Sequence, residues 1–172
     1  MKILLTLLLS FLLIIGFTQT QSDDRGYHAQ VGDIAPDLTL TLTTGDTLQI
    51  NSLRGKVVVL QFTASWCSVC RKEMPHLESE IWQPNKDKDF ILIGVDYDEP
   101  LDKVNDFVKQ MKITYPMALD PGGEHFNKFA YPKSGVTRNV VIDKEGKIVF
   151  LTRLYDPVEF NEMKNVISGL LK

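Results

Sequence analysis

Apolar and polar positions change their spacing several times along the chain, and each spacing predicts a different element. Residues 38–42 alternate at a period of two and are followed, across a polar turn at 44–46, by a second short strand at 47–50. This pattern predicts a β-hairpin. The continuous apolar runs at 56–62 and 90–95 are rich in β-branched residues and predict buried strands.

Helical spacing follows both buried strands. After the first strand, four apolar residues share one helical face: Cys70, Met74, Leu77 and Ile81. Pro75 falls inside this helix and predicts a kink, because proline has no backbone N–H to donate. After the second strand, apolar positions predict a helix over about 98–111. The remaining pattern predicts a short strand at 113–117, a brief helix through 129, strands at 136–142 and 147–152 joined by a tight turn, and a final helix at 157–171. This order of elements is typical of an α/β sandwich with a mixed sheet.

The N-terminus has a different pattern. Lys2 precedes an apolar run at 3–17, and a polar tract follows at 18–24. This pattern predicts a signal peptide over residues 1–20 and a domain over 21–172. No small-x-small cleavage site is visible, so an uncleaved N-terminal membrane anchor stays open as an alternative. The expected location is periplasmic or otherwise extracytoplasmic, with the domain either secreted or anchored.

Composition narrows the function classes. The 172 residues are 44% hydrophobic, which suffices for one globular domain with a substantial core. The formal net charge is −3 and no Lys/Arg block interleaves with aromatic residues, so no nucleic-acid partner is expected. The two cysteines are too few for a disulfide-stapled scaffold.

Both cysteines lie where the first buried strand turns into a helix. Cys67 and Cys70 are three residues apart, so in a first helical turn they lie on the same side and can close a small disulfide. Cys67 would also lie at the positive end of the helix dipole, which favours a thiolate. The pair therefore has the properties of a redox dithiol.

Two other interpretations of the pair are weaker. A zinc site needs about four protein ligands, whereas the chain has no second cysteine pair and its three histidines form no cluster in the sequence. No metal site is therefore predicted. A purely structural disulfide that closes so short a loop would add little stability by the chain-entropy argument.

The segment from Trp66 through Cys70 to Pro75, with the later hairpin and final helix, resembles a thioredoxin fold. More narrowly, the signal-like N-terminus, the turn-rich 32–37 segment, the helix inserted after Val95 and the 142–148 hairpin are similar to TlpA/ResA-type extracytoplasmic thiol–disulfide oxidoreductases. The resemblance implies a thioredoxin-like three-layer sandwich over 21–172. In it, helices flank a central mixed sheet, with an N-terminal β-hairpin and an inserted helix.

The resemblance also implies an activity. Cys67 would attack the disulfide of a client protein and Cys70 would resolve the mixed disulfide, so the enzyme would be a protein-disulfide reductase. It would need no cofactor beyond the Cys67–Cys70 disulfide. Its partners would be disulfide-containing secreted proteins and a membrane electron donor or acceptor. Glu73 matches a glutamate that ResA-like reductases keep beside the dithiol, where a partly desolvated carboxyl could shuttle protons; an exposed helix carboxylate is the alternative.

Three further residues are candidates for substrate binding. Trp66 is expected to pack beside Cys67 and shield the pair. Thr137 falls where a cis-proline faces the dithiol in the family, and a cis bond before threonine costs roughly 3–4 kcal/mol, so we expect a trans bond. Arg138 would stabilise the Cys67 thiolate if it lay close by; a solvated arginine at a strand end is the alternative. Gln61 replaces the buried strand aspartate of thioredoxin, which leaves Glu73 or water for any proton relay.

Two other functions stay open. Thr63 and Arg138 could serve a thiol peroxidase of the peroxiredoxin type, although the usual Pro-x-x-x-Thr-x-x-Cys spacing is missing. A non-enzymatic copper-binding module like the Sco proteins would use the cysteine pair with a distant histidine such as His125, but its cysteines are normally spaced one residue further apart.

Overall fold

The computed structural model of the protein describes residues 25–172. The predicted signal peptide at 1–20 lies outside the described residues, as does the start of the predicted domain at 21–24. Within residues 25–172, no helix has the length and apolar character needed to cross a membrane.

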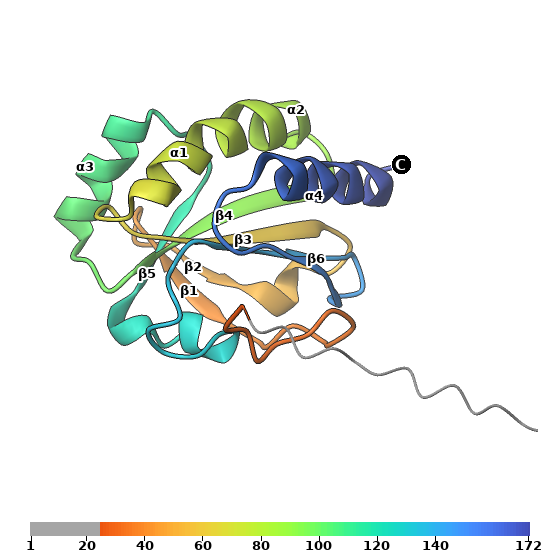
Figure 1. Ribbon diagram of the computed structural model, residues 1–172, viewed down its shortest axis with the longest axis horizontal. Coiled ribbons are helices and arrows are strands. Elements are labelled where there is room, and N and C mark those ends of the chain that lie inside the picture. The colour runs from red at the N-terminus through yellow and green to blue at the C-terminus, as the bar shows by residue number, and fades with distance from the viewer. Residues whose placement is uncertain (1–24) are drawn as a thin grey trace, which may run out of the picture.

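One mixed sheet of seven strands organises the described chain, in the order β2-β1-β5-β4-β3-β6-β7 (Figure 1). The strands are β1 (Thr39–Leu42), β2 (Thr47–Gln49), β3 (Val57–Thr63), β4 (Phe90–Tyr97), β5 (Met117–Asp120), β6 (Arg138–Ile142) and β7 (Ile148–Leu151). The central strand β3 runs parallel to β4 and antiparallel to β6. All seven of its residues are buried, as its apolar run predicts.

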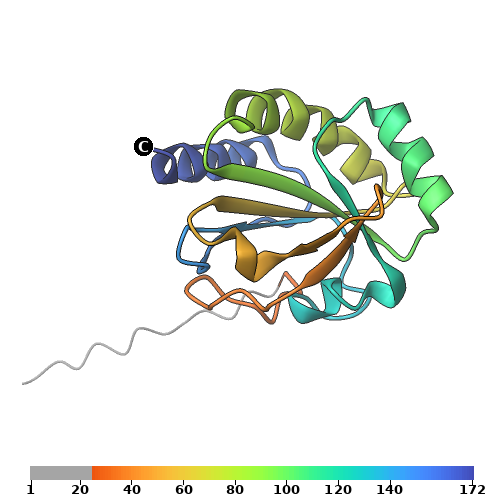
Figure 2. The same ribbon diagram turned by 180° about the vertical axis from the view of Figure 1, so that it is seen from behind.

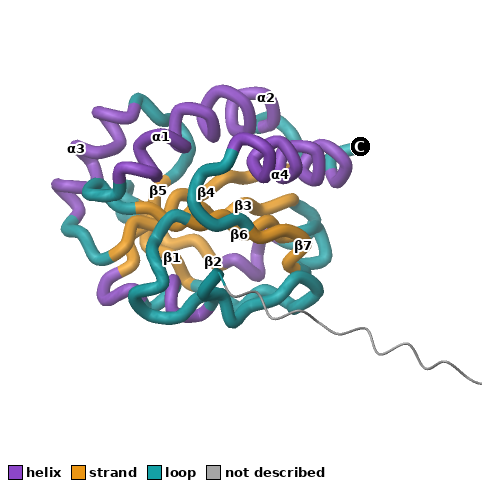
Figure 3. Tube along the Cα trace, in the orientation of Figure 1, coloured by secondary structure: helices purple, strands orange, loops and turns teal. Residues whose placement is uncertain are grey.

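Helices and short helical turns cover the two faces of this sheet differently. They are α1 (Ser68–His76), α2 (Gln83–Asn85), α3 (Leu101–Met111), α4 (Pro157–Leu170), the 3-10 turns η1 (Ile50–Leu53), η3 (Pro121–Gly123) and η4 (Phe126–Lys128), and the π-helical segment η2 (Leu77–Trp82). The helices α1, α3 and α4 share one core with the upper face of the sheet in Figures 1 and 3. The N-terminal segment, η1 and η4 cover the opposite face, which lies below the sheet in Figure 1 and also in Figure 2, where the molecule is seen from behind.

This arrangement has the layers of the expected thioredoxin-like sandwich, with an N-terminal hairpin and an inserted helix. The hairpin forms where the alternating pattern predicts it, since β1 pairs with β2 across the turn at 43–46. The predicted strand at 113–117 is wrong. The strand β5 begins only at Met117 and pairs with β4 and β1, because Pro116 has no N–H for a ladder and the buried Tyr115 contributes its side chain instead.

The helix that follows the dithiol continues past Pro75. The α-helical segment α1 ends at His76, the π-helical segment η2 follows directly, and α2 completes the helix. The π-helical bonding begins at Leu77, two residues after Pro75, next to the turn in which the proline leaves a carbonyl without its N–H donor. The predicted inward face is confirmed, because its four residues are all buried: Cys70, Met74, Leu77 and Ile81.

Candidate active site

The two cysteines form a disulfide at the start of α1. Cys67 is the N-cap residue of this helix, with extended backbone angles, and its Sγ accepts a hydrogen bond of 3.1 Å from the backbone N–H of Cys70. The two Cα atoms lie 5.3 Å apart. A sulfur that caps a helix N-terminus receives both an N–H donor and the positive end of the dipole. Both would stabilise a thiolate on Cys67 after reduction.

Burial distinguishes the two sulfur-bearing residues. Cys67 is 7% exposed, whereas Cys70 is 0% exposed and packs into the core. A partner disulfide can therefore reach Cys67 first, and only Cys70 is positioned behind it to complete the exchange. This asymmetry agrees with the roles that the sequence predicts for the two thiols.

Thr137 lies directly against the disulfide. Its Oγ1 is 3.1 Å from Cys67 Sγ and 3.3 Å from Cys70 Sγ. A disulfide has no S–H, so here the hydroxyl is the donor. Residues 25–172 contain no cis peptide bond, so the bond before Thr137 is trans, as expected. The threonine thus occupies the place opposite the dithiol and adds a polar contact that a proline could not make.

Glu73 lies one helical turn after Cys70, on the same buried side of α1. Burial raises the pKa of Glu73 from 4.5 to about 7, although a hydrogen bond of 2.7 Å from Asn139 Nδ2 to Oε1 favours the charged form. The second carboxylate oxygen, Oε2, has no hydrogen-bond partner. The alternative that Glu73 is an exposed helix carboxylate is therefore wrong. A carboxyl that titrates near neutral pH can both accept and release a proton.

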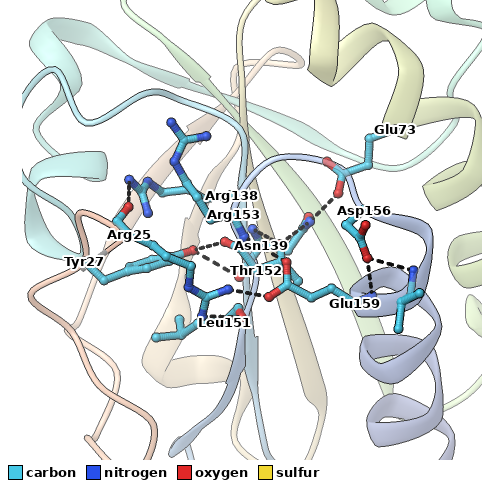
Figure 4. A network of polar contacts seen from close by, with 11 residues as sticks. Arg25, Tyr27, Glu73, Arg138, Asn139, Leu151, Thr152, Arg153, Asp156 and Glu159 are labelled. Atoms are coloured by element: carbon cyan, nitrogen blue, oxygen red, sulfur yellow. Dashed lines mark hydrogen bonds and ion pairs between the residues drawn. The ribbon is translucent and has the colours of Figure 1, made fainter. Parts of the chain in front are cut away.

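A polar network extends from Glu73 across the end of the sheet (Figure 4). Asn139 Nδ2 donates to Glu73 and to Thr152 Oγ1 at 2.9 Å, and Tyr27 Oη donates to the carbonyl of Thr152 at 2.7 Å. On the other side of Glu73, Gln61 accepts a hydrogen bond of 2.8 Å from Tyr115. These buried groups hold one another in fixed orientations, and so they fix the position of the Glu73 carboxyl.

A second carboxylate holds the turn that leads into the dithiol. Glu99 accepts hydrogen bonds from the Ser65 backbone N–H at 2.5 Å and from Ser65 Oγ at 2.7 Å. Burial opposes its ionisation, but the bonds from Lys103 and Ser65 lower the pKa of Glu99. Nearby, burial and the charge of Glu99 raise the pKa of Asp96 to about 8. Arg71 Nε donates to the Ser65 carbonyl at 2.8 Å, so Arg71 and Glu99 both hold Ser65 in the turn before Cys67.

Trp66 borders two pockets, and Cys67 lines one of them. One pocket, of about 230 Å³, is lined by Trp66, Cys67, Ser68, Val69, Gly135, Val136, Thr137, Arg153 and Leu154. The other, of about 260 Å³, is lined by Trp66, Tyr97, Phe126, Lys133, Gly135 and Val136. Trp66 is 62% exposed and lines the same pocket as Cys67, so it lies beside the pair. That it shields the pair stays a prediction. Its exposed apolar ring borders both pockets.

The surroundings of Arg138 exclude one of its two interpretations from the sequence. It is fully buried, which excludes a solvated arginine. It pairs with Phe62 in the sheet, whereas the next residue, Asn139, is the one that faces Glu73, so the Arg138 side chain lies on the sheet face opposite α1. Its guanidinium donates to the Arg25 carbonyl at 2.8 Å and lies 4.2 Å from the centroid of the Tyr27 ring. In this structure it anchors the N-terminal segment.

The two residues that suggested a peroxidase are not brought together at Cys67. The Thr63 hydroxyl lies 3.6 Å from Met74 Sδ, under α1, and Arg138 lies on the other sheet face. Among residues 25–172, no group of three or more His, Cys, Asp or Glu side chains has an arrangement suited to a metal ion.

Several site residues were missed by the sequence interpretation. Asn139 and Thr152 come from two strands read only as apolar, and Arg153 comes from a loop with no pattern of its own. Asp96 and Glu99 did carry a signal, because they are acidic residues at the end of the buried strand beside β3. Parallel strands bring their carboxyl ends to the same edge of a sheet, so this pair could have been placed near Cys67.

The fold and the dithiol define the class of this protein: it is a thiol–disulfide oxidoreductase with a thioredoxin-like fold. Residues 30–167 match the Redoxin family, and the chain belongs to that family. It is 34% identical over 140 residues to the thiol-disulfide oxidoreductase ResA of Bacillus cereus (strain ATCC 10987 / NRS 248), covering 78% of this chain and 77% of the relative.

Solved structures agree with this assignment. A solution structure of a proposed protein disulfide isomerase from Bacteroides thetaiotaomicron is 56% identical, with a TM-score of 0.83 over 85% of this chain and 92% of that one. A crystal structure of a proposed thiol:disulfide interchange protein DsbE from Chlorobium tepidum is 28% identical, with a TM-score of 0.74 over 83% of this chain and 99% of that one.

Proposed function

We propose that the protein is an extracytoplasmic reductase of disulfides in other proteins. In the forward reaction, the Cys67 thiolate attacks one sulfur of the client disulfide, and the other client sulfur leaves as a thiolate and takes up a proton. The Cys70 thiolate then attacks Cys67 Sγ, which releases the second client thiol and leaves the Cys67–Cys70 disulfide. Two electrons pass from the dithiol to the client.

The buried Glu73 is the observation that carries the direction of electron flow. Glu73 lies one turn after Cys70 on the buried side of α1, so its charge, when the carboxyl ionises, would oppose a thiolate on Cys70 and would destabilise the reduced form relative to the disulfide. A dithiol whose reduced form is destabilised gives up its electrons more readily. While it is protonated, the same carboxyl can deliver a proton to a thiolate that forms inside the protein.

The sequence pattern at residues 1–24 supports the location. An apolar run after Lys2, followed by a polar tract, is the arrangement that directs chains out of the cytoplasm. Outside the cytoplasm the dithiol would need a source of electrons, which we propose is a membrane thiol–disulfide donor. Its clients would be secreted proteins that contain disulfides.

A redox titration tests this proposal. The protein would be equilibrated at a series of thiol–disulfide poises, and Cys67–Cys70 oxidation would be measured by alkylation and mass. A midpoint near the thioredoxin value of about −270 mV is expected for a reductase, whereas one near about −120 mV would make the protein an oxidant. Glu73→Gln should move the midpoint to a less negative potential. An unchanged midpoint would remove Glu73 from the argument for direction.

Failure to form the disulfide at any poise would overturn the dithiol cycle itself. Peroxide consumption and copper binding by the reduced protein would then test the two alternative functions.

A further inference from the structure

The loop that joins β7 to α4 contributes two residues to the pocket beside Cys67: Arg153 and Leu154. The Leu154 N–H donates to the Thr137 carbonyl at 3.1 Å, which ties this loop to the residue that contacts both sulfurs. Leu154 has φ of 65°, in the left-handed region that a branched side chain rarely adopts. Strained backbone of this kind is concentrated at binding and active sites. Here it directs an exposed apolar side chain to the rim of the pocket.

The Arg153 guanidinium approaches Gly135 with its Nη2 end. A Cβ at position 135 would come within 2.1 Å of Arg153 Nη2, so only glycine permits this approach. Nη2 donates to the Ser134 carbonyl at 2.8 Å. Nη1 is buried and has no hydrogen-bond partner, although the arginine as a whole is only half-buried. The loop and the glycine together hold a guanidinium at the wall of the pocket that also contains Cys67.

No carboxylate of residues 25–172 forms an ion pair with this guanidinium. Asp156, three residues further on, caps α4 by accepting from the backbone N–H groups of Val158 and Glu159. Glu159 accepts a bond from the Arg153 backbone N–H and forms an ion pair with Arg25 (Figure 4). Burial lowers the pKa of Arg153. The protein therefore keeps a partly desolvated cation beside its disulfide with no internal anion to compensate it. An incoming carboxylate would supply that compensation through charge attraction and a charge-assisted hydrogen bond.

We propose that Arg153 is a specificity-determining residue that binds a carboxylate of the client polypeptide, an Asp or Glu side chain next to the cysteine that Cys67 attacks. The exposed Trp66 and Leu154 lie on either side and would contact apolar groups of the same segment. This inference rests on the proposed function, since it names the class of client. The bonds made and broken are those of the exchange described above.

Three matched peptides test the proposal. Each carries the same intramolecular disulfide, and they differ only in the residue beside the attacked cysteine, which is Glu, Gln or Lys. The rate constant for reduction by the reduced protein would be measured at low and high ionic strength. We expect the Glu peptide to react about tenfold faster than the Gln peptide at low salt, and the advantage to shrink at high salt, where exposed charges are screened. The Lys peptide should be the slowest.

Variants assign the preference to one residue. Arg153→Gln should abolish the Glu-over-Gln ratio, Arg153→Lys should keep part of it, and Arg153→Glu should reverse the order of the Glu and Lys peptides. Arg54→Gln is the matched control, because Arg54 is an exposed arginine at the opposite end of β3, where its side chain contacts Asn51 and packs on Gly146. Its ratio should equal that of the wild type.

The outcomes separate this inference from the proposed function. Equal rates for all three peptides, or a ratio that persists in Arg153→Gln, would overturn the role of Arg153 while leaving disulfide reduction intact. A wild-type protein that reduces none of the peptides would refute the proposed function itself. If Arg153→Glu fails to fold, the Gln and Lys variants still decide the question, because each rate ratio is measured within a single protein.

Discussion

Glu73→Gln should remove the part of the pH dependence of stability between pH 4.5 and 7 that the Glu73 carboxyl contributes. The carboxyl is buried, and its pKa is raised from 4.5 to about 7. Over this window the folded protein holds a proton that the unfolded chain has released, so the stability of the wild type falls as pH rises. Below pH 4.5 both states are protonated and the penalty is absent. Above pH 7 the penalty is complete. Glutamine cannot ionise, so the variant lacks this slope.

The size of the effect follows from the shift. The difference between about 7 and 4.5 is about 2.5 pH units, which at about 1.36 kcal/mol per unit gives about 3 kcal/mol. Glutamine can still accept the hydrogen bond from Asn139, but its amide has to find a partner where Oε2 has none. This second effect does not depend on pH. It displaces the variant's stability by a constant and leaves the pH-dependent difference at about 3 kcal/mol.

Urea unfolding of the oxidised protein at half-unit steps from pH 4.5 to 8 would measure the contribution of Glu73 to the pH dependence of stability. The quantity is the free energy of unfolding of the variant minus that of the wild type, in which the titrations of all other groups cancel to first order. It should rise by about 3 kcal/mol from the lowest to the highest pH. Glu162→Gln, at an exposed position of α4, should give a flat difference. A flat difference for Glu73→Gln as well would refute the account of a buried, proton-holding carboxyl.

Six other substitutions, taken in three pairs, test separate parts of the structure. Glu99→Gln removes the charge that accepts both hydrogen bonds from Ser65, so it should destabilise the protein by about 1–3 kcal/mol in urea unfolding. Asp102→Asn is the control at an exposed position of α3, and its free energy of unfolding should stay within about 0.5 kcal/mol of the wild type. Thr137→Val removes the hydroxyl beside both sulfurs. If that hydrogen bond stabilises the Cys67 thiolate by about 1 kcal/mol, alkylation of reduced Cys67 at neutral pH should slow roughly fivefold. Thr137→Pro should change the rates with protein clients, and unaltered rates would argue against a client contact at this position. Gly94→Ala places a Cβ 2.1 Å from Met117 Sδ and should cost about 1–3 kcal/mol, while Gly169→Ala, with nothing within 4 Å, should stabilise α4 by up to about 1 kcal/mol.

Most of the sheet could be predicted from the sequence because its strands carry a strong local signal. The run that became β3 is apolar on both faces, and only a central strand with cover on both sides explains such a run. The prediction of a strand at 113–117 was wrong because its apolar residues are buried without belonging to a strand. Ile113 and Tyr115 are apolar and buried, but they fill the core from a loop, and burial alone does not distinguish a strand from a packed connection.

The dithiol was also predictable, because its two members lie three residues apart and their geometry is local. The rest of the site is not local. Glu73 gains its raised pKa from burial under a strand more than 60 residues away, and its hydrogen-bond partner Asn139 comes from that strand. The contacts of Arg138 could not be predicted, because its face of the sheet depends on the register of β6 against β3, and a shift of one residue exchanges the two faces.

The N-terminal segment has a consequence for when the fold can be completed. Tyr27 forms a bridge with Ala130 and its hydroxyl bonds to Thr152, while the Arg25 carbonyl accepts from Arg138. The first described residues are thus fastened to some of the last, and β3 is flanked by β6, which follows it by about 80 residues. A chain that emerges from its N-terminus cannot close this structure until nearly all of it has been made, and long-range pairing of this kind is slow. For a protein exported as we propose, that delay would keep the chain unfolded while it waits to cross the membrane.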